Sequence, residues 1–192
     1  MDFIFDVGNV LVDYKPVVYL DSLFSDSSLV KIINIAIFQS PEWLYMDQGT
    51  LSHAEASNIF CARLPELEYA IIKTMESVNN IFTPLPETIK LLPIIKESGH
   101  SLYFLSNIHN EIRDFLLENH QYFSLFDGGV FSCDVKLTKP SPEIYRFLIE
   151  KYQLNAQDCL FFDDIEENVA AAEKEGIKGV LFTTAECVLP YI

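Results

Sequence analysis

The sequence predicts an α/β protein, a doubly wound parallel sheet with an inserted small α-helical domain, and three observations lead to this prediction. Short apolar runs of strand length alternate with amphipathic segments over the second half of the chain. The runs are near-continuously hydrophobic, which is typical of parallel strands buried on both faces. Between the first and second runs lies a long stretch that has helical patterns and no convincing strand.

Five apolar runs are expected to form the sheet: Asp2–Phe5, Ser101–Leu105, Gly129–Phe131, Cys159–Phe162 and Gly179–Phe182. Helices are expected around the last four runs, at Pro86–Ser98, His109–Asn119, Pro142–Tyr152 and Glu166–Glu175. The first of these helices opens on proline and stops at Gly99, as helices commonly do. Strands that alternate with helices favour a parallel sheet with right-handed crossovers.

The long stretch between the first two runs is expected to form a helical cap on the α/β core. Its amphipathic segments are Pro16–Phe24, Ser28–Phe38, Ser52–Leu64 and Leu67–Ile81. Pro84 and Pro86 mark the return of the chain to the core. The predicted division is therefore a core of residues 1–13 and 84–192 and a cap of residues 14–83.

Composition narrows the classes of partner. At 192 residues with 49% hydrophobic side chains, the chain can build a sizeable core. Its net charge of −15 argues against nucleic acid and anionic membranes as partners. Four widely spaced cysteines without a CxxC pair indicate reduced thiols in a cytoplasmic protein. No basic signal-peptide region and no membrane-length apolar run is present, and nothing indicates an oligomeric state.

Polar residues follow the ends of the predicted strands, where open parallel sheets bind their ligands. They are Asp6, Gly8 and Asn9, then Ser106 and Asn107, then Lys139, and finally Asp163 and Asp164. A carboxylate such as Asp6 can attack phosphorus to form an aspartyl-phosphate, which water then hydrolyses. Mg²⁺ with oxygen ligands would neutralise the charge between nucleophile and substrate. A serine hydroxyl and a lysine ammonium would hold the other phosphoryl oxygens.

Four segments resemble motifs of the haloacid dehalogenase-like hydrolase superfamily, in the family's order. They are FIFDVGNVLVD, LYFLSN, LTKPSPEIY and LFFDDIEENVAAAEKEGI. The resemblance covers nearly the whole chain and implies a Rossmann-like core with a type 1 helical cap in the place of the insertion. It implies Asp6 as nucleophile, Ser106 in the phosphate-binding place and Lys139 as the lysine of the third motif.

The resemblance also implies a Mg²⁺ site. Asp6 and Asp164 would be direct ligands, Asp163 their neighbour in the metal site, and Gly8 would contribute its backbone carbonyl. Asn107 is expected to bind substrate phosphate together with the serine and lysine. Ser106 and Asn107 could equally cap the following helix, whose N-terminus is itself an anion site; Asp163 and Asp164 could cap theirs.

One position departs from the family's usual pattern. Most phosphatases of this family carry a second aspartate two residues after the nucleophile as general acid/base, and here that residue is Gly8. The DxGNV form resembles a sugar-phosphatase-like branch of the family. A placed proton donor contributes about 10²–10⁴-fold to rate, so substrates with good leaving groups would suffer least.

The predicted function is a Mg²⁺-dependent phosphatase for a small phosphorylated metabolite, with a sugar phosphate as one candidate. A 2-haloacid dehalogenase using Asp6 without metal is a first alternative, although the Asp163–Asp164 pair argues against it. A non-catalytic relative that binds phosphometabolites is the second. Asn168 is expected to orient the acidic loop. His109 is expected to lie at the surface or cap a helix, and a place in the cleft is the alternative. Trp43, Tyr45 and Asp47 are candidates for cap residues that face the cleft.

Overall fold

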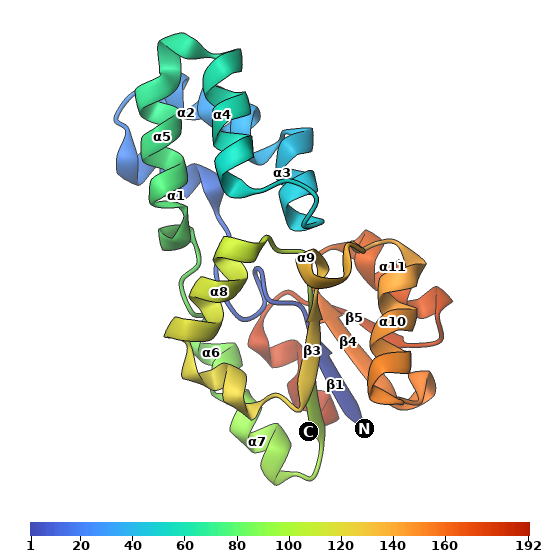
Figure 1. Cartoon of the computed structure of the whole chain (residues 1–192). Coiled ribbons are helices and arrows are strands. Elements are labelled where there is room, and N and C mark those ends of the chain that lie inside the picture. Colours follow the sequence, from blue (N-terminus) through green and yellow to red (C-terminus); the bar gives the residue numbers. More distant parts are fainter.

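The computed structural model describes residues 1–192, and one five-stranded parallel sheet lies at its centre (Figure 1). The strands are β1 (Asp2–Phe5), β2 (Ser101–Ser106), β3 (Gly128–Phe131), β4 (Cys159–Asp163) and β5 (Lys178–Leu181). Their order is β3-β2-β1-β4-β5, and every pair is parallel. This confirms the predicted fold class.

The register brings the ends of three strands level. Phe5, the last residue of β1, lies opposite Phe104 of β2 and Phe162 of β4. The chain order reverses on either side of β1, which makes the end of this strand the switch point where parallel sheets bind ligands. The polar residues that follow β1, β2 and β4 therefore emerge at one edge of the sheet.

Helices cover both faces of the sheet (Figure 1). One face is covered by α7 (Leu91–Glu97) and α8 (Asn110–Asn119), and the other by α10 (Pro142–Tyr152) and α11 (Glu166–Lys174). Alternation along β1 divides the core, because Phe3 and Phe5 pack with the first pair of helices and Ile4 packs with the second. All three side chains are fully buried.

The prediction that the strands are buried on both faces is confirmed for the three central strands and wrong for the two edge strands. β1, β2 and β4 are almost wholly buried, whereas β3 is buried only in its second half and β5 is exposed or half-buried throughout. An edge strand has one neighbour only, and fewer helices cover it. Apolar composition alone does not show where a strand lies in the sheet.

The predicted helix at Pro86–Ser98 is two helices, α6 (Pro86–Ile89) and α7, which meet at Lys90. Pro93 explains the break, because it has no N–H to donate to the carbonyl of Ile89 one turn earlier. A short helix, α9 (Ser132–Val135), follows β3. Brief 3₁₀ turns occupy Pro65–Leu67, Val78–Ile81, Gln121–Leu125, Ala156–Asp158, Ala185–Cys187 and Leu189–Tyr191.

Between β1 and α6 the chain forms helices only, and these lie beyond the carboxyl ends of the strands (Figure 1). They are α1 (Pro16–Leu23), α2 (Ser27–Ile33), a π-helical turn (Asn34–Phe38), α3 (Pro41–Asp47), α4 (His53–Arg63) and α5 (Glu68–Glu76). We refer to these helices as the cap. The division of the chain at residues 13/14 and 83/84 stays a prediction.

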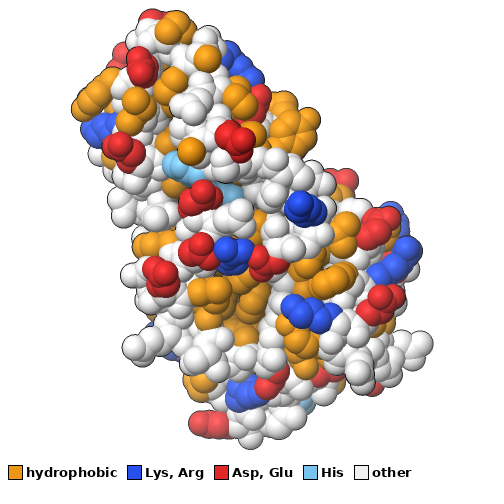
Figure 2. Space-filling model, viewed as in Figure 1, with side chains coloured by type: hydrophobic (Ala, Val, Ile, Leu, Met, Phe, Trp, Pro, Cys, Tyr) orange, Lys and Arg blue, Asp and Glu red, His pale blue; other side chains and the backbone are white.

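Helix α3 was not predicted, because its seven residues are too few to show a period. Its start is nevertheless encoded locally: the Ser40 hydroxyl accepts the Trp43 N–H at 3.2 Å, and Pro41 occupies the first turn. None of the helices has the combination of length and apolar character that crossing a bilayer requires. On the face in Figure 2, acidic side chains are spread over cap and core without a continuous basic patch.

Candidate active site

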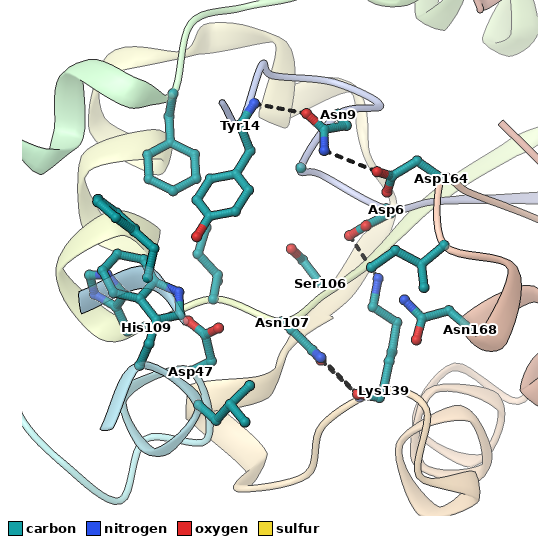
Figure 3. Close-up of a pocket in the computed structure, with 17 residues that line it drawn as sticks. Asp6, Asn9, Tyr14, Asp47, Ser106, Asn107, His109, Lys139, Asp164 and Asn168 are labelled. Carbon is teal, nitrogen blue, oxygen red and sulfur yellow. Dashed lines mark hydrogen bonds and ion pairs between the residues drawn. The ribbon is translucent and has the colours of Figure 1, made fainter. Parts of the chain in front are cut away.

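A cavity of about 290 Å³ lies between the cap and the carboxyl ends of the strands (Figure 3). The core contributes Asp6, Gly8, Asn9, Ser106, Asn107, Ile108, His109, Lys139, Asp164, Ile165 and Asn168, and the chain from Tyr14 to Phe82 contributes Tyr14, Phe38, Trp43, Leu44, Asp47 and Phe82. The structure thus brings the site residues predicted from the sequence to one place, except that Asp163 lies just beneath the floor and is fully buried.

Lys139 joins two of the carboxylates. Its ammonium nitrogen lies 2.8 Å from Asp6 Oδ1 and 2.7 Å from Asp163 Oδ2, and its side chain is 1% exposed. Lys139 is therefore a buried residue of the site and not a surface lysine. Burial opposes its charge, but Asp6 and Asp163 outweigh that effect and raise the pKa of Lys139 above its ordinary value.

The pKa of Asp6 is raised from 3.8 to about 7. Burial is the largest cause, the nearby charge of Asp163 adds to it, and Lys139 opposes it. The Val7 N–H also donates to Asp6 Oδ1, at 2.7 Å. One lysine therefore does not neutralise the carboxylates around it, and a further cation would be needed to hold Asp6 fully ionised at neutral pH.

Asn107 fixes the position of Lys139 by a two-point amide contact. Its Nδ2 donates to the Lys139 carbonyl at 2.8 Å, and its Oδ1 accepts the Lys139 N–H at 2.8 Å. Neither Asn107 nor Ser106 caps α8, because His109 is the residue at the N-cap. The Ser106 hydroxyl points into the cavity (Figure 3), while a phosphate contact by Asn107 stays a prediction.

The two acidic residues after β4 are held differently. Both oxygens of Asp163 accept from Asn168 Nδ2 at 3.1 Å, and its Oδ1 also accepts the Ile165 N–H at 2.8 Å. This agrees with the expected role of Asn168 in orienting the acidic loop. Neither aspartate provides a side-chain cap for α11, whose N-cap residue is Ile165.

Asp164 has a single side-chain partner. Its Oδ2 accepts from Asn9 Nδ2 at 3.0 Å, and Asn9 Oδ1 in turn accepts the Tyr14 N–H at 2.9 Å. Burial raises the pKa of Asp164, and the donor from Asn9 opposes that shift. The sequence showed Asn9 as part of a motif but gave it no role; here it ties the loop after β1 to the acidic loop after β4.

Three carboxylate oxygens, one each from Asp6, Asp163 and Asp164, lie within 4.8 Å of one another. Hard oxygen donors in this number suit Mg²⁺, which prefers carboxylates together with water. Gly8 lines the same cavity, so its backbone carbonyl is available beside them. The donor set fits the metal that the sequence analysis predicts.

The wall opposite the carboxylates is aromatic. The rings of Phe38 and Trp43 are 4.7 Å apart, those of Tyr14 and Phe82 are 5.5 Å apart, and His109 meets the Trp43 ring edge-on at 5.2 Å. His109 is 2% exposed, so the expected surface position is wrong. It occupies the N-cap position of α8 without a side-chain cap hydrogen bond, and it lines the cavity, as the alternative predicted. Phe38 and Phe82 were not identified from the sequence, because an aromatic residue near an amphipathic segment is usually interpreted as part of the hydrophobic core.

Of the three cap candidates, Trp43 and Asp47 line the cavity and Tyr45 does not. Tyr45 is 51% exposed on the outer side of α3. Asp47 points into the cavity (Figure 3), and burial raises the pKa of its carboxyl to about 8. It is the one acidic side chain that the cap contributes to the cavity wall.

The chain is similar in sequence and fold to several known proteins. The chain is 28% identical over 180 residues to the sesquiterpene phosphatase astK of Aspergillus oryzae, covering 94% of this chain and 88% of that protein. Its fold is similar to that of the magnesium complex of the HAD family enzyme BT-2542 from Bacteroides thetaiotaomicron, at 19% identity and a TM-score of 0.74, covering 95% and 92% of the two chains. It is also similar to L-2-haloacid dehalogenase from Xanthobacter autotrophicus, at 18% identity and a TM-score of 0.69, covering 98% and 80%.

The family model for haloacid dehalogenase-like hydrolases matches residues 3–176, a range that contains β1 from Phe3 onward, β2, β3, β4 and every residue that lines the cavity. The chain therefore belongs to the haloacid dehalogenase-like hydrolases.

Proposed function

We propose that this chain is a Mg²⁺-dependent phosphatase that hydrolyses a small phosphate monoester through an aspartyl-phosphate on Asp6. The observation that carries the proposal is the cluster of Asp6, Asp163 and Asp164 oxygens within 4.8 Å of one another, beside one buried ammonium. Displacement of halide from a carbon atom by a carboxylate needs no such cluster. A phosphoryl group, which is itself anionic, needs positive charge between it and the nucleophile.

Asp6, Asp164 and the Gly8 carbonyl would hold the metal, with Asp163 beside them. Mg²⁺ bound there supplies positive charge that orients and neutralises phosphoryl oxygens. Asp6 presents its free oxygen to phosphorus. Ser106 and Lys139 donate to the phosphoryl oxygens, and the two-point contact from Asn107 keeps Lys139 in place for this task.

The substrate's organic group would occupy the part of the cavity formed by Tyr14, Phe38, Trp43 and Phe82. A wall of packed aromatic rings favours an apolar or ring-shaped group, and the similarity to a sesquiterpene phosphatase supports the same choice. A sugar phosphate, to which the DxGNV form points, stays the second candidate. The cavity volume of about 290 Å³ limits either one to a small molecule.

The position of the helical insertion, between β1 and β2, supports the assignment of a type 1 cap. On the same basis we propose a small phosphorylated metabolite as the partner, without nucleic acid or membrane. A cytoplasmic location is part of the same proposal.

Phosphate release tests the proposal directly. Wild type and Asp6→Asn would be assayed with p-nitrophenyl phosphate, an isoprenoid monophosphate and a set of sugar phosphates, each with Mg²⁺ and with EDTA. We expect release that requires Mg²⁺ and is lost in Asp6→Asn. The preferred member of the panel would decide between an apolar and a sugar substrate.

Two results would point elsewhere. Halide release from 2-chloropropionate that EDTA leaves unchanged would identify a dehalogenase, a reaction to which the absence of a side chain at Gly8 is no obstacle. Binding of inorganic phosphate without any turnover would identify a non-catalytic member of the family.

A further inference from the structure

The loop after β1 offers no proton donor to a leaving oxygen, because the residue two positions after Asp6 is Gly8. Across the cavity from Asp6, the carboxyl of Asp47 points inward from the C-terminal end of α3 (Figure 3). We propose that Asp47 is the general acid and base of this site and supplies from the cap the proton transfer that Gly8 cannot. This inference rests on the proposed phosphatase function.

The main chain of Asp47 is fixed to the core. The Ser132 hydroxyl, at the start of α9, donates to the Asp47 carbonyl. The same hydroxyl accepts the Ile108 N–H at 2.9 Å, and Ile108 is two residues beyond Ser106. One side chain thus connects the cap residue to the loop that carries the phosphate-binding serine. This connection sets where the Asp47 carboxyl lies relative to the bound phosphate.

A second contact holds the next two residues on α9. Gly49 has a φ of +69°, and a Cβ at this position would lie 2.3 Å from the Cys133 carbonyl oxygen. Gln48 Nε2 donates to the Lys136 carbonyl at 3.3 Å. The turn after α3 therefore rests directly on the backbone of α9, and the position of Asp47 follows from tight packing between cap and core rather than from a mobile surface loop.

The surroundings keep the Asp47 carboxyl protonated at neutral pH. Burial alone raises its pKa to about 8, with no cation to oppose the shift. Tyr14 and Cys133 face it as neutral groups, since burial raises the pKa of the Cys133 thiol to about 11 and that of Tyr14 further still. His109 is neutral as well, because burial lowers its pKa.

Two pairs of charged groups lie near this contact, and Lys136, just after α9, is exposed and forms no ion pair. On α9, Asp134 pairs with Arg113, and on α3, Glu42 pairs with Arg63. On α4, His53 lies 6.1 Å behind the His109 ring. A carboxylic acid that faces a cleft with its proton in place is the form that a general acid requires.

The proposed steps balance. An Asp6 oxygen forms a bond to phosphorus as the bond from phosphorus to the leaving oxygen breaks. The Asp47 proton passes to that oxygen, so an alcohol departs and Asp47 becomes a carboxylate. Water then attacks the phosphorus of the aspartyl-phosphate and gives its proton to Asp47. Inorganic phosphate leaves, and the Asp6 carboxylate and the Asp47 acid are restored.

Asp47→Asn tests this role by leaving-group dependence. With Mg²⁺ present, we expect kcat for an alkyl phosphate to fall by about 10²–10⁴-fold, because an alkoxide leaves poorly without a proton. With p-nitrophenyl phosphate, whose leaving group needs no proton, we expect a loss of under about threefold. The fall of kcat at alkaline pH with the alkyl ester should also disappear. Tyr45→Phe, on the exposed side of the same helix, is the matched control.

A rescue variant separates proton transfer from a structural role. A Cβ at Gly8 would meet only Tyr14 Cβ, at 3.9 Å, so an aspartate side chain can begin there without a clash. We expect Gly8→Asp combined with Asp47→Asn to regain most of the alkyl phosphate turnover. A structural defect in the cap would not be repaired by an acid placed on the loop after β1.

Equal losses with both esters, or no loss with the alkyl ester, would overturn the inference. So would failure of the rescue in a double variant that melts at the wild-type temperature. All three leave the proposed function standing, since they require wild-type turnover that depends on Mg²⁺ and Asp6. Absence of that turnover would instead contradict the phosphatase proposal itself.

Discussion

Lys139 Nζ lies 2.8 Å from Asp6 Oδ1, and this ion pair is buried between the end of β1 and the loop after α9. The same ammonium also holds Asp163, at 2.7 Å. A buried pair of this kind contributes little net stability compared with apolar packing, but removing one partner is costly because it leaves the other charge unpaired. A substitution that removes the Lys139 ammonium should therefore affect both the activity and the stability of the protein.

Lys139→Met should abolish phosphate release and destabilise the fold by about 3–5 kcal/mol at neutral pH. The loss should shrink near pH 5, because Asp6 can then be neutral and needs no partner. Chemical denaturation at both pH values measures it. Combining Lys139→Met with Asp6→Asn should recover part of the lost stability; an additive loss in the double variant would mean that the two side chains are not coupled.

The metal-free protein should lose stability as pH rises from about 4 to about 8. The folded-state pKa of Asp6 is raised to about 7 and that of Asp47 to about 8, both from 3.8. Between those limits the unfolded chain has released protons that the folded chain retains, so rising pH favours unfolding. Each group should lower the free energy of unfolding by on the order of 1 kcal/mol per pH unit. Each kcal/mol lost should lower Tm by about 2–4 °C.

Thermal melting in EDTA across this pH range provides the measurement. Asp47→Asn should remove the part of the slope between about pH 7 and 8, and a slope that persists there would assign it to another group. At lower pH, Asp6 and Asp47 both contribute to the slope, together with Asp164, whose pKa burial also raises. Asp47→Asn should therefore reduce the slope there without removing it.

Mg²⁺ should raise Tm more at pH 8 than at pH 5.5, because Asp6 must lose its proton before it can bind the metal. Asp164→Asn should abolish this stabilisation while leaving the metal-free protein as stable as wild type or more so, since it removes one charge from a cluster of three. Differential scanning calorimetry with and without Mg²⁺ tests both statements. A wild-type Mg²⁺ response in Asp164→Asn would exclude this residue as a ligand.

Gly49→Ala should destabilise the protein and lower kcat, because the new methyl would lie 2.3 Å from the Cys133 carbonyl oxygen and push α3 away from α9. Gly99→Ala is the matched control: its φ is +82°, and nothing lies within 4 Å of its Cβ position. It should show only the backbone cost, about 1–2 kcal/mol, with kcat unchanged. Equal effects of the two substitutions would mean that the cap contact does not position the site.

The sequence was sufficient to predict the sheet and the core of the site. β1, β2 and β4 are marked by apolar runs, and the residues that leave them, such as Asp6 and Ser106, must meet because parallel strands end at one edge. The helix Pro142–Tyr152 was predicted with its observed bounds, since its proline start and strong periodicity agree.

Other features depend on contacts that no local pattern reveals. The break at Lys90 follows from a hydrogen bond that Pro93 cannot make, and the exposure of β5 follows from its place at the edge. Phe82 joins the cavity wall only because the chain returns from the cap beside Tyr14. The raised pKa of Asp47 likewise arises from burial in the folded structure, which the neighbouring residues in the sequence do not indicate.

Ser132 connects the cap to the loop after β2, which carries Ser106. Its hydroxyl binds the Ile108 N–H on the loop and the Asp47 carbonyl on the cap. Any movement of α3 away from α9 would break the second bond and would leave the hydroxyl free to rotate away from the first. Access to the cavity and retention of phosphate within it would then change together, so that the site loosens its hold on the product as it opens.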